Sequence, residues 1–218
     1  VRLLLFRMKD KRYRLTEFFL LFVVFPATLP LDYAIWVKLI LGVIGFLYVV
    51  WVLVRVEKIE LFNSLKLPWR PFWKRILVIF PVVVSLTTLY VWLFAPQHLF
   101  FVPLENPLLF LFILFVYSVF SVWPQEVLYR TFFFKRYGDF FQSTYLLIFV
   151  NATVFCLAHL FFRNTLVLVL TFIGGILFGL TYLKFKSTTL VTIEHAIYGN
   201  WLFTVGMGQM LGFPGIEN

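Results

Sequence analysis

Residues 107–134 read PLLFLFILFVYSVFSVWPQEVLYRTFFF, an almost continuous apolar run that contains one glutamate, Glu126, and one arginine, Arg130. At about 1.5 Å per residue, a helix of this length can cross the ~30 Å hydrocarbon core of a bilayer. Ionisable side chains are costly inside hydrocarbon, so a carboxylate and a guanidinium in one span need partners or a function. We therefore expect a membrane-spanning helix that carries part of a buried polar site.

The composition of the whole chain indicates the same class. Of the 218 residues, 62% are hydrophobic, 22% are aromatic and only 13% are charged, and the mean hydropathy is +0.94. These values lie outside the range of soluble globular domains and predict an all-α, polytopic transmembrane helical bundle of about seven spans. Besides residues 107–134, the expected spans cover about residues 15–31, 33–54, 76–94, 144–162, 165–183 and 188–211.

The net charge of +9 is explained by membrane topology and does not indicate nucleic-acid binding, because the basic residues cluster between the apolar runs. If the N-terminus is cytoplasmic, 16 of the 19 basic residues face the cytoplasm. These residues are Arg2, Arg7, Lys9, Lys11, Arg12, Arg14, Arg55, Lys58, Lys66, Arg70, Lys74, Arg75, Lys135, Arg136, Lys184 and Lys186. The positive-inside rule thus predicts a multi-pass protein of the cell (plasma) membrane with a cytoplasmic N-terminus.

The chain is expected to form a single integral membrane domain. Residues 1–104 would supply N-terminal transmembrane helices and a basic cytoplasmic loop, and residues 105–211 would form the core that carries the polar residues. The first apolar segment follows a basic stretch but has no small-residue cleavage site, so we interpret it as a retained span. The single cysteine, Cys156, excludes an intrachain disulfide and a cysteine-based metal cluster.

Three short polar strings lie in separate apolar segments of this core. They are Gln125-Glu126-Val127-Leu128-Tyr129-Arg130, Phe155-Cys156-Leu157-Ala158-His159 and His195-Ala196-Ile197-Tyr198-Gly199-Asn200. Glu126 and Arg130 are four residues apart and can pair on one helix face. A carboxylate and two imidazoles can activate a water, stabilise an oxyanion and protonate a leaving amine, which are the tasks of peptide hydrolysis.

Other intramembrane protease chemistries lack the residues they need. The sequence has no His-Glu-x-x-His string for a zinc site and no Gly-x-Ser-Gly-like nucleophile string. The aspartates Asp10, Asp32 and Asp139 all lie at segment ends, so a two-aspartate dyad inside the membrane is unsupported. A glutamate, two histidines and an asparagine remain as the candidate catalytic groups.

The three strings, over about residues 105–205, resemble the CAAX-protease and bacteriocin-processing family of intramembrane endopeptidases. The resemblance implies a helical membrane core with a water-filled cavity that cleaves a membrane-associated, CAAX-like peptide or protein. With this resemblance in view, we interpret Glu126 as the general base, His159 and His195 as oxyanion stabilisers or proton carriers, and Arg130 as the group that orients Glu126. Family members have been described as metalloproteases and as glutamate proteases. We expect no cofactor, with zinc on Glu126, His159 and His195 as the alternative.

Two positions depart from the family pattern. Gln125 stands where the family usually has its first glutamate, and a neutral amide cannot act as the base. Asn200 follows His195 by five residues where the family usually has four, and Gly199 occupies the usual position. These departures leave open an inactive or weakened pseudoprotease that acts as a scaffold or immunity protein. A proton-coupled transporter that uses Glu126 and the histidines is a third hypothesis.

Two of the three strings place their polar residue at the same expected distance from the cytoplasmic end of the span. At about 1.5 Å per residue, Glu126 lies ~14 Å from Lys135, and His195 lies ~14 Å from Lys186. His159 lies ~24 Å from Ser143, so it reaches the same level only if its span is strongly tilted or begins below the membrane surface.

Overall fold

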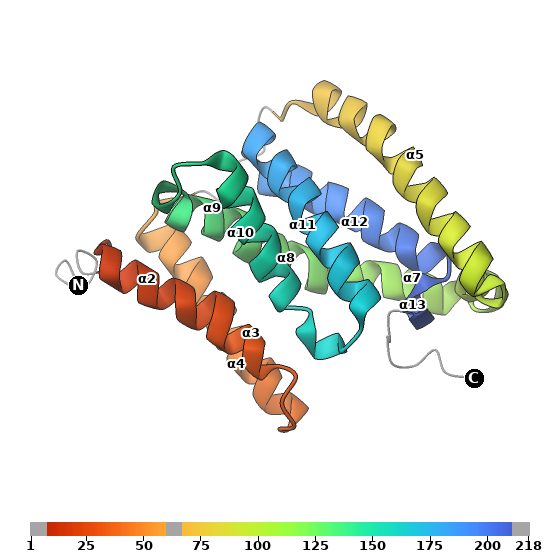
Figure 1. Cartoon of the computed structure of the whole chain (residues 1–218), viewed down its shortest axis with the longest axis horizontal. Helices are drawn as coiled ribbons and strands as arrows, with labels where there is room; N and C mark the ends of the chain where they lie inside the picture. Colours follow the sequence, from red (N-terminus) through yellow and green to blue (C-terminus); the bar gives the residue numbers. More distant parts are fainter. Residues whose placement is uncertain (1–7, 60–66, 211–218) are drawn as a thin grey trace.

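The computed structural model describes residues 8–59 and 67–210, and it confirms the all-α prediction. The structure is 85% helical, and the described residues contain no strand. The helices form one bundle in which segments far apart in the sequence lie side by side (Figure 1). The expected basic residues Arg2, Arg7 and Lys66 lie outside the described residues, as does the last residue of the expected segment 188–211.

Each of the seven expected spans corresponds to a helical segment. The N-terminal three are α2 (Lys11–Phe19) with η1 (Leu20–Val24) and α3 (Phe25–Thr28), α4 (Ile35–Arg55) and α5 (Trp69–Phe94). The short elements η2 (Pro96–His98) and α6 (Phe101–Glu105) lead to α7 (Pro107–Val116), η3 (Tyr117–Val122), α8 (Trp123–Glu126), η4 (Val127–Phe132), α9 (Phe133–Tyr137) and η5 (Gly138–Phe140). The last three segments are α10 (Thr144–Leu157) with η6 (Leu160–Phe162), α11 (Thr165–Phe185), and α12 (Thr188–Thr204) with α13 (Met207–Met210).

Five segments of the described chain are long and apolar enough to cross a membrane. They are Ile35–Arg55, Trp69–Phe94, Pro107–Phe140, Thr144–Phe162 and Thr165–Phe185. The first expected span begins with the charged helix α2, and the last contains α12, which has 17 residues. A bundle of about seven spans is compatible with these lengths.

The span that contains Glu126 is not a regular α-helix, because α8 lies between two π-helical segments, η3 and η4. Pro124 lies in the first turn of α8 and has no N–H to donate, which favours a widened turn before it. A similar π-helical segment, η1, precedes Pro26. Such segments change which side chains share a face, so an α-helical wheel does not describe this span.

The helices α10 and α11 form a closely packed hairpin. Gly175 of α11 lies against the Ala152 backbone of α10, where a Cβ atom would come within 2.8 Å of the Ala152 Cα. The Asn164 side chain caps α11 by accepting hydrogen bonds from the backbone N–H groups of Leu166 and Val167. The hairpin thereby fixes the turn that carries His159.

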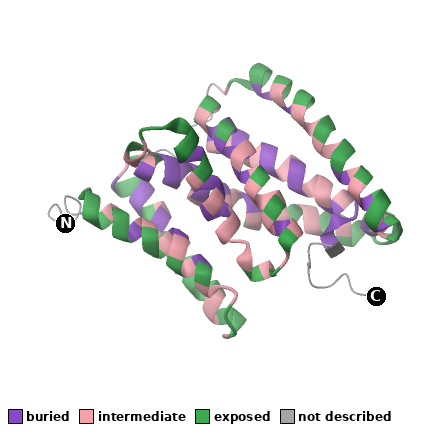
Figure 2. Ribbon diagram, viewed as in Figure 1, coloured by how far each residue is buried: buried purple, intermediate pink, exposed green. Residues whose placement is uncertain are grey.

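Burial divides the molecule into a core and a lipid-compatible exterior (Figure 2). Buried residues gather on the inner helices, whereas α4 and α5 carry many exposed residues along their lengths. Their exposed side chains include Leu39, Val43 and Leu47 on α4 and Leu86 on α5, which are apolar, as expected for contact with hydrocarbon. The polar strings therefore lie in the interior of a membrane bundle.

Candidate active site

A carboxylate of α8, a guanidinium of η4 and an imidazole of α12 meet in the interior. Glu126, at the end of α8, has no exposed surface, and its Oε1 atom lies 2.7 Å from Nδ1 of His195 on α12. The carboxylate accepts this hydrogen bond, so Nδ1 of His195 carries the proton. On the other side of the carboxylate, Arg130 Nε lies 3.4 Å from Glu126 Oε2. Glu126 is thus held between His195 and Arg130.

Arg130 is itself fixed by neighbouring helices. Its NH1 group donates to Asn151 Oδ1 on α10 at 3.0 Å, and the Asn151 amide donates to the Tyr129 carbonyl at 2.6 Å. The guanidinium carbon lies 4.6 Å from the centre of the Phe155 ring, a favourable cation–π distance. These contacts compensate part of the cost of burying the arginine, which has no exposed surface.

His195 is held from three directions besides Glu126. Its Nε2 atom lies 3.2 Å from the hydroxyl of Tyr117, at the start of η3. Its ring stacks on Phe178 of α11 with centroids 4.3 Å apart, and the edge of Phe155 lies against it at 5.8 Å. Because Nδ1 donates to Glu126, Nε2 is the acceptor that faces Tyr117.

His159 lies beyond the end of α10, in the turn before η6, and not within a helix as its string suggested. Its Nδ1 atom donates to the carbonyl of Phe155 at 2.8 Å, which leaves Nε2 as an acceptor. The Phe155 ring contacts His159 at 4.8 Å as well as His195. Phe155, the phenylalanine of the second string, therefore packs against both imidazoles.

Both histidines open onto one cavity of about 510 Å³. Polar groups on its wall include Tyr117, Ser121, Gln125, His159 and His195. Most of the remaining lining is apolar, including Val83, Val167, Leu170, Ile173, Leu177 and Leu202. Glu126 is not among the lining residues; it reaches the cavity only through His195. A mostly apolar cavity with a few convergent polar groups is a typical small-ligand or substrate site.

Gln125 and Asn200 occupy different environments. Gln125 Nε2 donates to Ser121 Oγ at 2.8 Å, and its Oε1 atom is buried without a hydrogen-bond partner beside the cavity. Asn200 Nδ2 donates to Ser118 Oγ at 3.0 Å, and Asn200 is not among the cavity residues. The structure therefore brings Glu126, Arg130 and His195 into contact, sets Gln125 and His159 on the same cavity, and turns Asn200 to Ser118.

Sequence reasoning missed two partners of this site. Tyr117 has a detectable signal, since Tyr117, Ser121 and Gln125 are spaced by four residues and all line the cavity. Arg75 was assigned to the basic loop, but it lies within α5, which begins at Trp69. The Arg75 side chain is largely buried next to α12. Arg75 Nε lies 3.4 Å from Glu194 Oε1, beside His195 in the sequence.

The side chains named for the zinc alternative are engaged by other partners in this structure. Among the described residues, no group of three or more His, Cys, Asp or Glu side chains is placed to hold a metal ion. Glu126 is already engaged by His195 and lies beside Arg130. The independence of hydrolysis from a metal stays a prediction, which a chelator experiment tests.

The fold and this site define a polytopic helical membrane protein with a buried Glu-His-Arg cluster beside an intramembrane cavity. Residues 107–202 match the family model described as type II CAAX prenyl endopeptidase Rce1-like. This match confirms the resemblance to the CAAX-protease and bacteriocin-processing family, and it spans all three polar strings. It supports a CAAX-type intramembrane protease in general. No curated protein and no solved structure matched the chain.

Proposed function

We propose that this protein is an intramembrane endopeptidase that hydrolyses a peptide bond of a membrane-associated, CAAX-like lipidated substrate. The observation that carries the proposal is the 2.7 Å contact between buried Glu126 and His195, whose other ring nitrogen faces the cavity side. A carboxylate behind an imidazole fixes its tautomer and stabilises the imidazolium that forms when it takes a proton.

The geometry favours His195, and not Glu126 as expected from the sequence, as the group that receives the proton of the water. Glu126 is buried behind His195, so it acts through the imidazole and does not touch the attacking water. His195 Nε2 receives the proton of the water while the water oxygen bonds to the carbonyl carbon and the carbonyl π pair moves to oxygen. On collapse, the C–N bond breaks and the same proton passes to the leaving amine.

Two further groups position the reactants. His159 donates from Nδ1 to the Phe155 carbonyl, so its Nε2 accepts the second hydrogen of the water and orients the oxygen. Gln125 Oε1, which has no hydrogen-bond partner within residues 8–59 and 67–210, accepts a backbone N–H of the substrate. Arg130 compensates the buried charge of Glu126 and fixes its orientation.

The membrane setting is part of the same proposal. The basic residues outside the apolar segments favour a cytoplasmic N-terminus, and the proposed site of action is the plasma membrane. The largely apolar cavity suits a peptide that carries a lipid or apolar side chains.

The test is cleavage of a library of membrane peptides, with and without a prenyl group, by the purified protein in liposomes. We expect turnover in the wild type that Glu126→Gln and His195→Gln each abolish, with no change on addition of a chelator. Loss of turnover with the chelator, restored by zinc, would contradict the metal-free mechanism. Unchanged turnover in both variants would contradict the assigned base.

One observation favours a pseudoprotease scaffold or immunity protein as a second candidate. Gln125 lies on the cavity wall at the position where the resembled family has a glutamate. A pseudoprotease would bind the peptides without cleaving them, and Gln125→Glu would then create turnover. If Gln125 only positions substrate, Gln125→Glu would not raise turnover.

A further inference from the structure

Gly199 leaves a notch in α12 that is filled by the side chain of Tyr117. Gly199 lies four residues after His195, so both residues face the same side of the helix. A Cβ atom at Gly199 would lie 2.0 Å from the Tyr117 hydroxyl oxygen and 2.4 Å from its ring carbon Cε1. Such distances are far below van der Waals contact, so a larger residue at this position would displace the tyrosine.

The notch places the Tyr117 hydroxyl against the imidazole at the cavity wall, where both residues line the cavity. The oxygen lies 3.2 Å from His195 Nε2, and Tyr117 is one of the cavity-lining residues. The ring is held edge-on against Phe203, with centroids 5.0 Å apart. With Nδ1 of His195 donating to Glu126, the tyrosine hydroxyl donates to Nε2.

This contact occupies the ring nitrogen that must receive the proton of the attacking water. Two arrangements can resolve the conflict: the tyrosine moves aside, or the proton passes through its hydroxyl. The hydroxyl has lone pairs to accept a proton from water while it gives its own to Nε2. The close fit of the ring against Gly199 and Phe203 holds the hydroxyl in place and favours the second arrangement.

We propose that Tyr117 relays the proton between the attacking water and His195, an inference that rests on the proposed endopeptidase function. As the water oxygen bonds to the carbonyl carbon, the water proton passes to Tyr117 Oη and the phenol proton passes to His195 Nε2. On collapse, the C–N bond breaks, the amine takes a proton from Tyr117, and His195 returns its proton to the phenol. The chain from Glu126 to water is then Glu126, His195, Tyr117.

The relay accounts for the glycine in the third string. The family pattern that the sequence resembles has asparagine at this position, four residues after the histidine. In this chain the phenol of Tyr117 fills the space that a side chain at position 199 would occupy. The polar group that contacts His195 is therefore the Tyr117 hydroxyl of η3 and not a side chain of α12.

The first experiment measures kcat and KM for Tyr117→Phe in liposomes, with Tyr90→Phe as the matched control. Tyr90 lies on α5, where its ring packs on Phe94, and it is not among the cavity residues. We expect Tyr117→Phe to lower kcat by about 10²-fold with KM changed less than about threefold, since general acid–base steps contribute 10²–10⁴-fold. A tyrosine that serves only in packing would leave kcat unchanged in Tyr117→Phe.

A second pair of variants moves the hydroxyl to the other helix. Tyr117→Ala removes the relay, and adding Gly199→Ser returns a hydroxyl to the notch, because the serine Cβ would lie where the tyrosine oxygen was. We expect the double variant to be at least about tenfold faster than Tyr117→Ala alone. A double variant no faster than Tyr117→Ala, together with full kcat in Tyr117→Phe, would overturn the relay and leave the proposed function intact.

A third measurement needs no turnover. Diethyl pyrocarbonate modifies imidazole nitrogens, and mass spectrometry reports the rate at His195. We expect Tyr117→Phe to raise this rate several-fold and Tyr90→Phe to leave it unchanged, because only the first exposes Nε2. An unchanged rate in Tyr117→Phe would refute the contact. Absence of wild-type turnover on all peptides would overturn the endopeptidase function and the relay together, even if the modification rate rises.

Discussion

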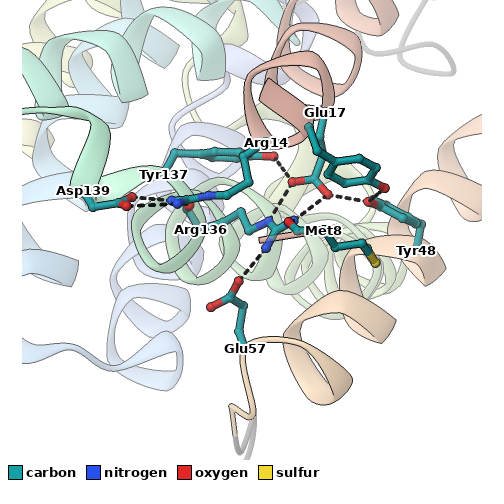
Figure 3. Close-up of polar contacts among 9 residues, drawn as sticks. Met8, Arg14, Glu17, Tyr48, Glu57, Arg136, Tyr137 and Asp139 are labelled. Carbon is teal, nitrogen blue, oxygen red and sulfur yellow. Dashed lines mark hydrogen bonds and ion pairs between the residues drawn. The ribbon is translucent and has the colours of Figure 1, made fainter. Parts of the chain in front are cut away.

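Arg130 and Arg136 are both buried and lie six residues apart on the same span, yet their surroundings differ. Every guanidinium nitrogen of Arg136 has an acceptor: Nε donates to Glu17 Oε2 at 2.7 Å, NH1 to Glu57 Oε1 at 2.7 Å, and NH2 to the Met8 carbonyl at 2.6 Å (Figure 3). Arg130 donates from Nη1 to Asn151 Oδ1 at 3.0 Å, but its Nε has only the 3.4 Å ion pair with Glu126, and its Nη2 has no hydrogen-bond partner among the described residues.

The carboxylates differ in the same way. Glu17 accepts from Arg136, from Tyr137 at 2.9 Å and from Tyr48. Glu126 accepts one hydrogen bond, from His195, and its Oε2 atom has no hydrogen-bond partner in the described chain. A fully satisfied polar network rigidifies a fold, whereas an incompletely satisfied one is costly and needs another reason to persist. We interpret the Glu17–Arg136 cluster as a structural clamp and the Glu126–Arg130 cluster as the functional one.

The clamp joins elements that are distant in the sequence. It ties α2 to α9 and to Glu57, which follows α4, and a second ion pair between Arg14 and Asp139 lies beside it (Figure 3). The N-terminal helices are thereby fixed to the span that carries Glu126.

The largest effect is expected for Glu126→Gln. The amide cannot stabilise the imidazolium of His195, so turnover should fall by about 10²–10⁴-fold. Peptide cleavage and the melting temperature should be measured on the same liposome preparation. A variant that loses stability but keeps its turnover would place Glu126 with the clamp and remove the contrast between the clusters.

Glu17→Gln is the matched change in the clamp. Removing the charge of Glu17 leaves Arg136 with Glu57 as its remaining charged partner, so we expect a loss of at most about 3–5 kcal/mol of stability. Turnover per folded molecule should equal that of the wild type. Denaturation in detergent, followed by cleavage assays at a temperature where the variant is folded, tests both parts, and a specific activity reduced tenfold would contradict a purely structural role.

Lysine at each arginine sharpens the comparison further. A lysine keeps the charge but lacks the planar fork that contacts several acceptors at once. Arg130→Lys should lower turnover about tenfold by misplacing Glu126, whereas Arg136→Lys should lower the melting temperature alone. Equal effects of Arg130→Lys and Arg136→Lys on turnover and on the melting temperature would show that the two clusters have the same role.

The smallest effect is expected for Asn200→Ala. Asn200 donates to Ser118 and does not line the cavity, so its loss should cost about 1 kcal/mol of stability and change turnover less than about threefold. Ser118→Ala should reproduce the same small change. A loss of turnover of a hundredfold would return Asn200 to the catalytic residues implied by the family resemblance.

Sequence reasoning reached the apolar segments, the helical class and the Glu126–Arg130 pair, because these depend on composition and local spacing. It could not reach the contact between Glu126 and His195, which are 69 residues apart and meet only through helix packing. The π-helical segments η3 and η4 also change which side chains share a face of this span, and sequence spacing did not predict them.

The charged residues show a second limit. Arg136 was expected to face the cytoplasm, and its side chain is buried against Glu17, 119 residues away. The side of the membrane on which it lies stays a prediction. Asp139, which the sequence places only at a segment end, pairs with Arg14. The positive-inside rule uses each basic residue only to predict topology. Whether a carboxylate from another helix pairs with that residue is visible only in the tertiary structure.

The tight contact between Gly175 and Ala152 has a consequence for biogenesis. The helices α10 and α11 are joined by a short turn, and closing a short loop costs little chain entropy. We expect this pair to enter the bilayer and associate as one unit during synthesis, so that His159 reaches its position before the ribosome has released α12. The active site would then be completed when α12 emerges.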